Sequence, residues 1–188
     1  MDEIKYEEKL RSQIKDAYGR VLYTYTAHHK FAARLIKQKN AIKVAQIVLT
    51  AISTVGFLAT IITNQVLLSW LGGITAALSL GLNLYTKDFN LQDDIQKHKN
   101  AADELWDVRE SYVSLLTDFE ILDKEEIRRQ RDKLQGAVSK VNRQYPGTDD
   151  KSYAEAQNAL KNEEEQTFNE GEVDELLPTG LRNKGANG

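Results

Sequence analysis

The strongest apolar pattern in the chain is a run of forty-three residues, Val44 to Thr86, without a single charged side chain. A helix rises about 1.5 Å per residue, and roughly 20 mostly apolar residues cross the hydrocarbon core of a bilayer. The run is therefore long enough for two spans, and Asn64-Gln65 supplies a short polar turn between them. The pattern predicts a hairpin of two antiparallel membrane-crossing helices, over residues 44–63 and 66–86.

Apolar stripes at helical spacing precede and follow this run. The first stripe consists of Leu10, Ile14, Ala17, Val21, Tyr25, His28, Ala32 and Leu35. The second recurs at alternating spacings of four and three, as Leu91, Ile95, His98, Ala102, Leu105, Arg109, Tyr112, Leu116 and Phe119. This alternation is a heptad seam with two polar exceptions, and it is compatible with pairing within one chain or between chains.

The absence of Gly and Pro from residues 82–135 predicts that the second span continues as one rod from Lys87 to Leu122. The N-terminal helix is expected to lie along this rod as an antiparallel partner. Asp123 and Glu126 form a capping-box pattern for a return helix, which is expected to end near Gln144.

A charged helix is expected over Ser152 to Glu165, and the capping pattern recurs at Asn169 and Glu172 for a short helix before Pro178. The chain thus divides into an N-terminal amphipathic helix, the apolar hairpin, a cytoplasmic rod with its return helix, and an acidic C-terminal segment. The corresponding ranges are 1–43, 44–86, 87–145 and 146–188. The predicted fold class is an all-α membrane protein with a transmembrane hairpin and long cytoplasmic helices packed as a helical or coiled-coil bundle.

Charge is distributed asymmetrically around the apolar run. Residues 1–43 hold 10 Lys and Arg against 5 Asp and Glu, whereas residues 87–188 hold 15 against 23. The basic residues nearest the membrane are Lys30, Arg34, Lys37, Lys39 and Lys43 before the run, and Lys87, Lys97 and Lys99 after it. The positive-inside rule then predicts a multi-pass protein of the bacterial inner membrane with both termini in the cytoplasm.

This charge pattern favours contact with anionic lipid rather than nucleic acid, so the lipid bilayer is the first expected partner. The chain contains no cysteine, which suits soluble parts that stay in a reducing compartment. A soluble protein with a buried hairpin is the alternative. It is disfavoured because two helices that are apolar on nearly every face would need cover all round.

No catalytic or cofactor-binding pattern is found. The chain lacks a phosphate-cradling glycine loop, a nucleophile elbow and a zinc ligand set, and neither span carries an ionisable residue. His28 and His29 are adjacent and point about 100° apart on a helix, so they do not form the usual metal pair. His98 is expected to be a hydrogen-bonded packing residue. We therefore expect no enzyme activity, no metal and no cofactor.

The spans do contain rows of small and hydrogen-bonding residues. Helix one carries Gln46, Thr50, Ser53, Thr60 and Asn64, with Phe57 in the same row. Helix two carries Ser69, Gly72, Ala76, Ser79, Asn83 and Thr86 in one row, and Gly73, Ala77 and Gly81 in a second. These residue types are typical of close helix packing and also of a water-filled path in an oligomer. Two helices cannot enclose a pore alone, so the second interpretation requires a homo-oligomer.

Several motifs follow one another in a fixed order along the chain. They are Tyr23-Thr24-Tyr25-Thr26-Ala27-His28-His29-Lys30, the tight hairpin, Leu84-Tyr85-Thr86-Lys87, Lys99-Asn100-Ala101-Ala102 and Leu105-Trp106, then Tyr145-Pro146-Gly147, Ser152-Tyr153-Ala154 and Phe168 to Pro178. Over residues 5–182 this layout resembles the SLATT family, the two-transmembrane effector domains associated with bacterial nucleotide-sensing defence systems.

The resemblance implies a membrane effector encoded beside a nucleotidyltransferase or a nucleotide-sensing protein, which forms pores in the inner membrane of a phage-infected cell. It implies that a nucleotide second messenger or a nucleotide-sensing partner protein is the trigger, and it supplies no catalytic residues. Two other functions stay open. One is a membrane-anchored scaffold that recruits a cytoplasmic partner through its helical arms, and the other is a holin-like lysis protein.

Overall fold

The computed structural model describes residues 2–63, 65–88, 90–169, 171–178 and 182, and within these ranges it contains helices and no strand. The helices are α1 (Asp2–Thr63), α2 (Val66–Asp88), α3 (Leu91–Thr117), α4 (Lys124–Gln144), α5 (Asp150–Lys161) and α6 (Glu172–Leu176). The all-α prediction is confirmed.

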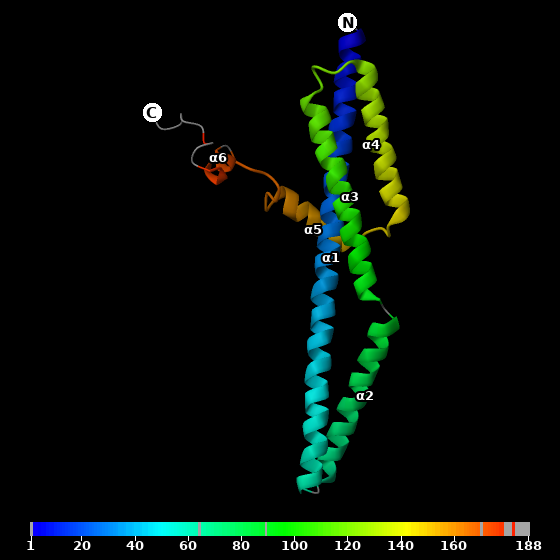
Figure 1. Cartoon of the computed structure of the whole chain (residues 1–188), viewed down its shortest axis with the longest axis vertical. Coiled ribbons are helices and arrows are strands. Elements are labelled where there is room, and N and C mark those ends of the chain that lie inside the picture. Colours follow the sequence, from blue (N-terminus) through cyan, green and yellow to red (C-terminus); the bar gives the residue numbers. More distant parts are fainter. Residues whose placement is uncertain (1, 64, 89, 170, 179–181, 183–188) are drawn as a thin grey trace.

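The longest element, α1, joins the N-terminal arm to the first half of the apolar run as one helix of 62 residues. It contains no proline, so nothing in its sequence removes a backbone hydrogen bond. Figure 1 shows α2 lying beside the second part of α1 and running in the opposite direction, with α3 beside the first part. Residues 44–63 of α1 together with α2 are called the apolar helix pair below.

The helices of the apolar pair expose their side chains instead of forming a core. Two stretches of the chain, Lys5–Ile62 within α1 and Val66–Thr117 over α2 and α3, each contain a window long and apolar enough to cross a membrane. Only 11% of the first window and 17% of the second is buried inside the protein. A core helix of a soluble protein would be mostly buried, so these windows have the exposure of a membrane protein.

The predicted continuous rod from Lys87 to Leu122 is wrong at both ends. α2 ends at Asp88, and α3 begins at Leu91 and ends at Thr117. Asn90 is the N-cap of α3, and its side-chain oxygen accepts a hydrogen bond from the backbone N–H of Asp93 at 3.2 Å. Asparagine is among the best N-cap residues, so a capping side chain starts a new helix where neither Gly nor Pro marks a break.

The core lies where the two predicted stripes meet between α1 and α3. Ile14 on α1 and Leu105 and Tyr112 on α3 are fully buried there. α3 runs antiparallel to α1, as predicted for the N-terminal arm and the rod (Figure 1). Because each helix contributes one apolar face, this pairing buries both stripes within a single chain.

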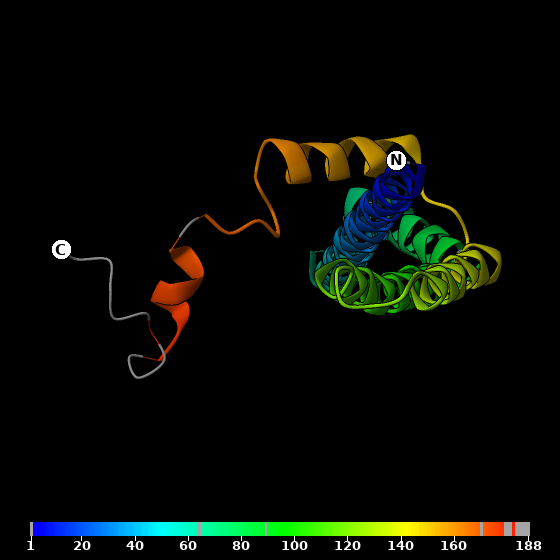
Figure 2. The same ribbon diagram turned by 90° about the horizontal axis from the view of Figure 1, so that it is seen from above.

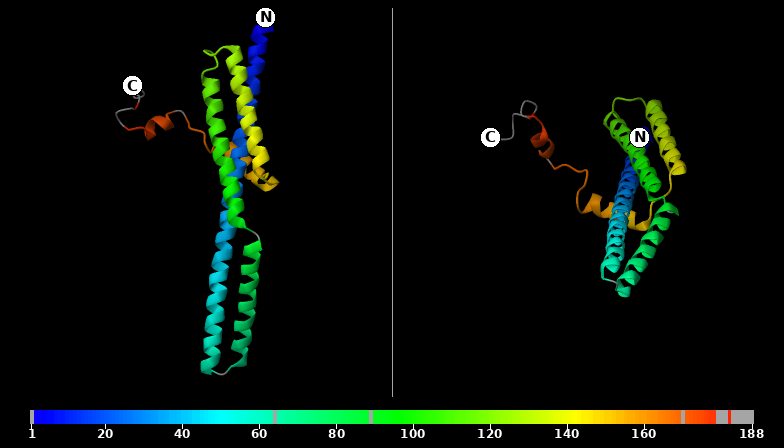
Figure 3. Two further views of the ribbon diagram at one scale, coloured as in Figure 1. Left: turned by 45° about the vertical axis from the view of Figure 1, so that its right-hand side comes forward. Right: turned by 60° about the horizontal axis from the view of Figure 1, so that its bottom comes forward.

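α4 packs along α3, also touches α1, and thereby closes this core (Figures 2 and 3). Asp123 is its N-cap and accepts a hydrogen bond from the backbone N–H of Glu126 at 2.8 Å, and the helix ends at Gln144, both as predicted. Its buried face, Ile127, Leu134 and Val141, belongs to the same core cluster as α1 and α3.

α5 lies across the bundle, as the view along the long axis shows (Figure 2). It occupies part of the predicted range Ser152 to Glu165 and begins two residues earlier, because Asp149 caps it and accepts a hydrogen bond from the backbone N–H of Ser152 at 2.8 Å. Ser152, Ala156 and Ala159 are fully buried, and α1 is the helix against which α5 packs.

Ion pairs join the C-terminal segment to the basic part of α1. Arg34 pairs with Asp149 and, at 3.3 Å, with Glu155, while Lys30 pairs with Glu165. The Arg34 guanidinium, with the Ser152 hydrogen bonds, holds the pKa of the Asp149 carboxyl well below its usual value. The acidic C-terminal segment therefore neutralises two of the five basic residues nearest the start of the apolar run.

The short helix α6 starts at Glu172 rather than directly after the predicted cap at Asn169. Gly171 occupies the cap position with φ +84°, a left-handed conformation that glycine adopts without strain. The Glu172 carboxylate still accepts a hydrogen bond from the backbone N–H of Asn169 at 2.9 Å, which is one half of the predicted box. α6 contains no buried residue.

Candidate functional site

The polar row of α1 faces α2 within the apolar helix pair. At the end nearest α3, Gln46 Nε2 donates to Asn83 Oδ1 at 2.9 Å. One turn deeper, the hydroxyl oxygens of Thr50 and Ser79 lie 3.3 Å apart. Each of these bonds crosses from one helix to the other, so the chain satisfies these polar groups internally.

The row continues toward the turn between the helices. Ser53 is buried and its hydroxyl donates to the carbonyl oxygen of Gly72 at 3.1 Å. Farther along, the Ser69 hydroxyl donates to Thr60 Oγ1 at 3.3 Å, and Ala76 is half-buried on the same side of α2. The structure thus brings the predicted polar rows together across one interface. Asn64, the last predicted member, lies outside the described residues.

The two helices also approach each other closely at Gly56, a residue that was not among the predicted site residues. A Cβ atom placed on Gly56 would lie 3.2 Å from the Cα of Gly72 and 3.3 Å from the carbonyl oxygen of Leu68. Phe57, which we expected in this row, is 48% exposed, and one atom of its ring would lie 3.6 Å from a Cβ placed on Gly72. The signal was present in the sequence, because Ser53, Gly56 and Thr60 repeat at helical spacings of three and four.

Replacing Gly56 by leucine is expected to separate the two helices. The atoms it would meet belong to the backbone of α2 and cannot turn away, so overpacking is expected to cost about 1–3 kcal/mol. Because the native chain has no cysteine, a Thr50→Cys, Ser79→Cys pair reports this packing through disulfide yield. Gly73→Leu is the matched control, since nothing lies within 4 Å of a Cβ there. Equal yields with and without Gly56→Leu would contradict the expectation.

The second small row has a different position. Gly73, Ala77 and Gly81 are all exposed, and a Cβ added to either glycine meets nothing within 4 Å. This row points away from α1, and the structure does not bring it together with the polar row. It leaves a narrow, smooth strip on the outer surface of α2.

A buried histidine pair lies on the α3 side of the apolar helix pair. His28 on α1 and His98 on α3 approach to 2.9 Å between their Nδ1 atoms, and both side chains are almost completely buried. One neutral ring must donate its proton to the other at this distance. Phe31 covers His98 with ring centroids 4.2 Å apart.

The surroundings of this pair disfavour the charged imidazolium form. Burial, and then the neighbouring His98, lower the pKa of His28 to about 4. Burial also lowers the pKa of His98, against an opposing effect of the Asp94 and Asp149 carboxylates. The sequence analysis placed both histidines on the packing stripes but did not pair them, because they are 70 residues apart.

A model of the family described as SMODS and SLOG-associating 2TM effector domain family 4, SLATT_4, matches residues 10–172. The chain belongs to the SLATT family. The resemblance inferred from the order of its motifs is thereby confirmed. No curated protein and no solved structure matches the chain.

The SLATT match runs from Leu10 in α1 to Glu172 in α6, so it includes the apolar helix pair and the helices that pack beyond it. The family is described as a two-transmembrane effector domain, in agreement with the two candidate spans. In this SLATT chain, the described residues contain no group of three or more His, Cys, Asp and Glu side chains that could hold a metal ion.

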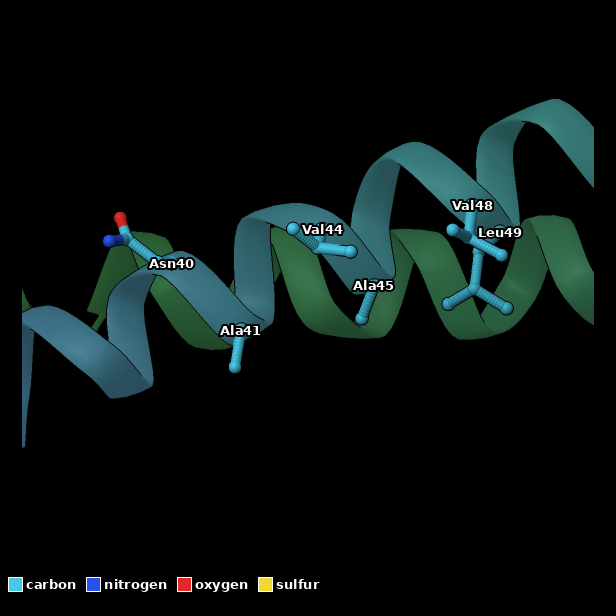
Figure 4. Close-up of a pocket in the computed structure, with 6 residues that line it drawn as sticks. All are labelled: Asn40, Ala41, Val44, Ala45, Val48 and Leu49. Carbon is cyan, nitrogen blue, oxygen red and sulfur yellow. The ribbon is translucent and has the colours of Figure 1, made fainter.

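The surface of this SLATT domain has a shallow groove of about 670 Å³ at the start of its apolar helix pair (Figure 4). All six lining residues come from α1: Asn40, Ala41, Val44, Ala45, Val48 and Leu49. Figure 4 shows the methyl groups of Ala41 and Ala45 pointing to the same side of the helix. Their small size leaves a dent in an otherwise bulky apolar face.

Proposed function

We propose that this SLATT protein is a membrane effector of bacterial anti-phage defence that permeabilises the inner membrane when a nucleotide signal activates it. The observation that carries the proposal is the apolar helix pair. Its large aliphatic side chains face outward, with Ile61 and Ile62 at 80% and 83% exposure, in a chain that matches a two-transmembrane effector family. Water does not stabilise such a surface, whereas lipid tails do.

The proposed orientation places both termini in the cytoplasm and the turn near Gln65 on the far side of the membrane. Lys43 at the start of the pair and Lys87 at its end lie at the same end of the two antiparallel helices. Positive residues near a span favour the cytoplasmic side, which supports this orientation.

Permeabilisation requires several copies, because one pair of helices has no lumen. The outward strip of Gly73, Ala77 and Gly81 allows the backbone of α2 to approach a neighbouring hairpin closely. Gln46, Thr50 and Asn83 are bonded within the chain but are only partly covered, so they remain available to line a path once hairpins assemble. In this proposal the same residues join the two helices in the single chain and line a polar path in the oligomer.

The cytoplasmic helices are proposed to hold the hairpin in its resting state. The contacts that support this role are the core between α1 and α3 and the ion pairs that tie Arg34 and Lys30 to the C-terminal segment. A nucleotide second messenger, or a nucleotide-sensing partner protein, is the proposed signal that releases them. No catalytic step is needed for this activity, and the protein is proposed not to be an enzyme.

The proposal is tested in cells that carry the gene with its native neighbours and that restrict a phage. We expect a potential-sensitive dye to report depolarisation of the inner membrane during infection and before lysis. Restriction with a normal membrane potential would contradict the effector function.

A scaffold function is the alternative, and it is favoured by the exposed apolar residues Phe168 and Leu176 on the acidic C-terminal segment. Replacing residues 44–86 by an unrelated two-helix anchor separates the two functions. The effector function predicts loss of protection with this chimera, provided that immunoblotting finds it in the membrane fraction. Full protection by the chimera would support the scaffold.

A further inference from the structure

The end of α2 and the start of α3 form a pocket against α1. The cavity has a volume of about 370 Å³ and is lined by Lys39, Ile42, Lys43, Gln46, Thr86, Asn90, Leu91 and Gln92. It exists because α3 starts as a separate, capped helix at Leu91, where a continuous rod would have run past α1. Its lining combines two ammonium groups with amides, a hydroxyl and two aliphatic side chains.

The two lysines make this pocket suitable for an anion. Lys39 Nζ donates to Gln92 Oε1 at 2.7 Å, which holds its ammonium group across the opening. Lys43 forms no ion pair with any residue that the structure describes. On α3, the Asp93 carboxylate is engaged by Lys97 at 2.5 Å.

The position of the pocket along α1, measured from the start of the apolar run, indicates where its anion comes from. The headgroup region adds about 5–7.5 Å on each side of the hydrocarbon core, and a helix rises about 1.5 Å per residue. Lys43 is adjacent to Val44, the first residue of the uncharged run, and Lys39 lies about 7.5 Å from it along the axis. Both ammonium groups therefore lie at the depth of lipid phosphates.

The other basic residues of α1 do not share this position. Arg34 and Lys30 lie about 15 and 21 Å from Val44 along the helix, beyond the headgroup layer. They are also paired with the carboxylates of the C-terminal segment. The pocket is thus the place where unneutralised positive charge, a cavity and headgroup depth coincide.

We infer that this pocket binds the phosphate of an anionic phospholipid from the cytoplasmic leaflet. Lys39 and Lys43 contact the phosphate, the amide of Gln92 keeps Lys39 in place, and Ile42 and Leu91 form the apolar part of the pocket lining. Because the lining comes from both α1 and the α2–α3 junction, a bound lipid links the cytoplasmic helices to the membrane surface. The inference rests on the proposed membrane insertion.

The test measures thermal unfolding of the full chain in neutral detergent against the concentration of added lipid. Phosphatidylglycerol is expected to raise the midpoint in a saturable manner, whereas phosphatidylcholine and inorganic phosphate at equal concentration are not. Equal stabilisation by phosphatidylcholine would overturn the anionic site. Equal stabilisation by inorganic phosphate would assign the pocket to a soluble anion and overturn the lipid.

Two charge-removing variants of α1 test whether the lipid binds in this pocket. Lys43→Gln is expected to weaken the apparent affinity for phosphatidylglycerol about tenfold, since a charge-assisted hydrogen bond is lost. Lys37→Gln, which removes the same charge from another face of α1, is expected to leave the affinity within about twofold. Equal losses in both variants would show a general charge effect and overturn the site.

A second pair tests the opposite wall without removing a lysine. Gln92→Glu adds a carboxylate beside the phosphate and is expected to weaken binding about tenfold, whereas Gln96→Glu, one turn along α3, is expected to have little effect. Carbonate extraction of cells is run in parallel. A wild-type chain that resists extraction but shows no lipid preference overturns the pocket alone, and a chain released by carbonate overturns insertion itself.

Discussion

Substituting leucine for Gly73 or Ala77 is expected to abolish depolarisation by the activated protein while leaving its insertion intact. Both residues lie on the exposed strip of α2, away from α1. A leucine there leaves the helix pair undisturbed, because a Cβ on Gly73 meets nothing within 4 Å. It would, however, keep the backbone of a neighbouring helix at a greater distance. We expect at least about a tenfold lower rate of dye-reported depolarisation, which corresponds to about 1.4 kcal/mol.

The control for this pair is Ala51→Leu, an equally exposed small-to-large change on α1. It is expected to retain activity, and all three variants are expected to stay in the carbonate-resistant membrane fraction. If Gly73→Leu and Ala77→Leu depolarise cells as the wild type does, the α2 strip is not the contact between subunits. If Ala51→Leu is also inactive, the effect is not specific to that strip.

Acidification from above pH 6.5 to pH 4 is expected to destabilise the packing of α1 against α3 by about 3 kcal/mol. The pKa of His28 is about 4 in the folded chain, against 6.5 for an unperturbed histidine. The unfolded chain therefore binds the proton more readily, so stability is present above pH 6.5 and is lost as the pH falls toward 4. Asp149 stays charged over this range because Arg34 holds its pKa low.

Circular dichroism melting of the chain in detergent measures this loss. A change of about 3 kcal/mol corresponds to a fall of roughly 6–12 °C in Tm for a chain of this size. His28→Asn, which keeps a hydrogen-bonding side chain but does not titrate, is expected to remove most of this pH dependence. His29→Asn, a change at the exposed neighbour, is expected to keep it. An unchanged pH profile in His28→Asn would contradict the role of the pair.

The sequence predicted those features that depend on local chemistry or on one helical face. Asp123 with Glu126 gave the start of α4 correctly, because an N-cap is a contact between residues three positions apart. The stripes through Ile14 and Leu105 gave the core between α1 and α3, because apolar residues at helical spacing share one face.

The sequence analysis missed the start of α3 and two contacts between helices. The start of α3 was overlooked because only Gly and Pro were treated as helix breaks, although Asn90 with Asp93 is itself a start signal. The contact of His28 with His98 depends on the register between two antiparallel helices, which periodicity alone does not fix. At the helix pair, the close contact of Gly56 with Gly72 depends on how the two helices face each other, which the spacing of residues along one helix does not fix.

The continuity of α1 has a mechanical consequence. At about 1.5 Å per residue its 62 residues form a helix roughly 93 Å long, which passes from the bundle with α3 and α4 to the tip of the apolar helix pair without interruption. The return path is divided between α2 and α3, so α1, unlike either of them, runs unbroken through both parts of the molecule. A displacement of the helices packed beside Leu10 can therefore reach Ser53 and Gly56 along one continuous helix.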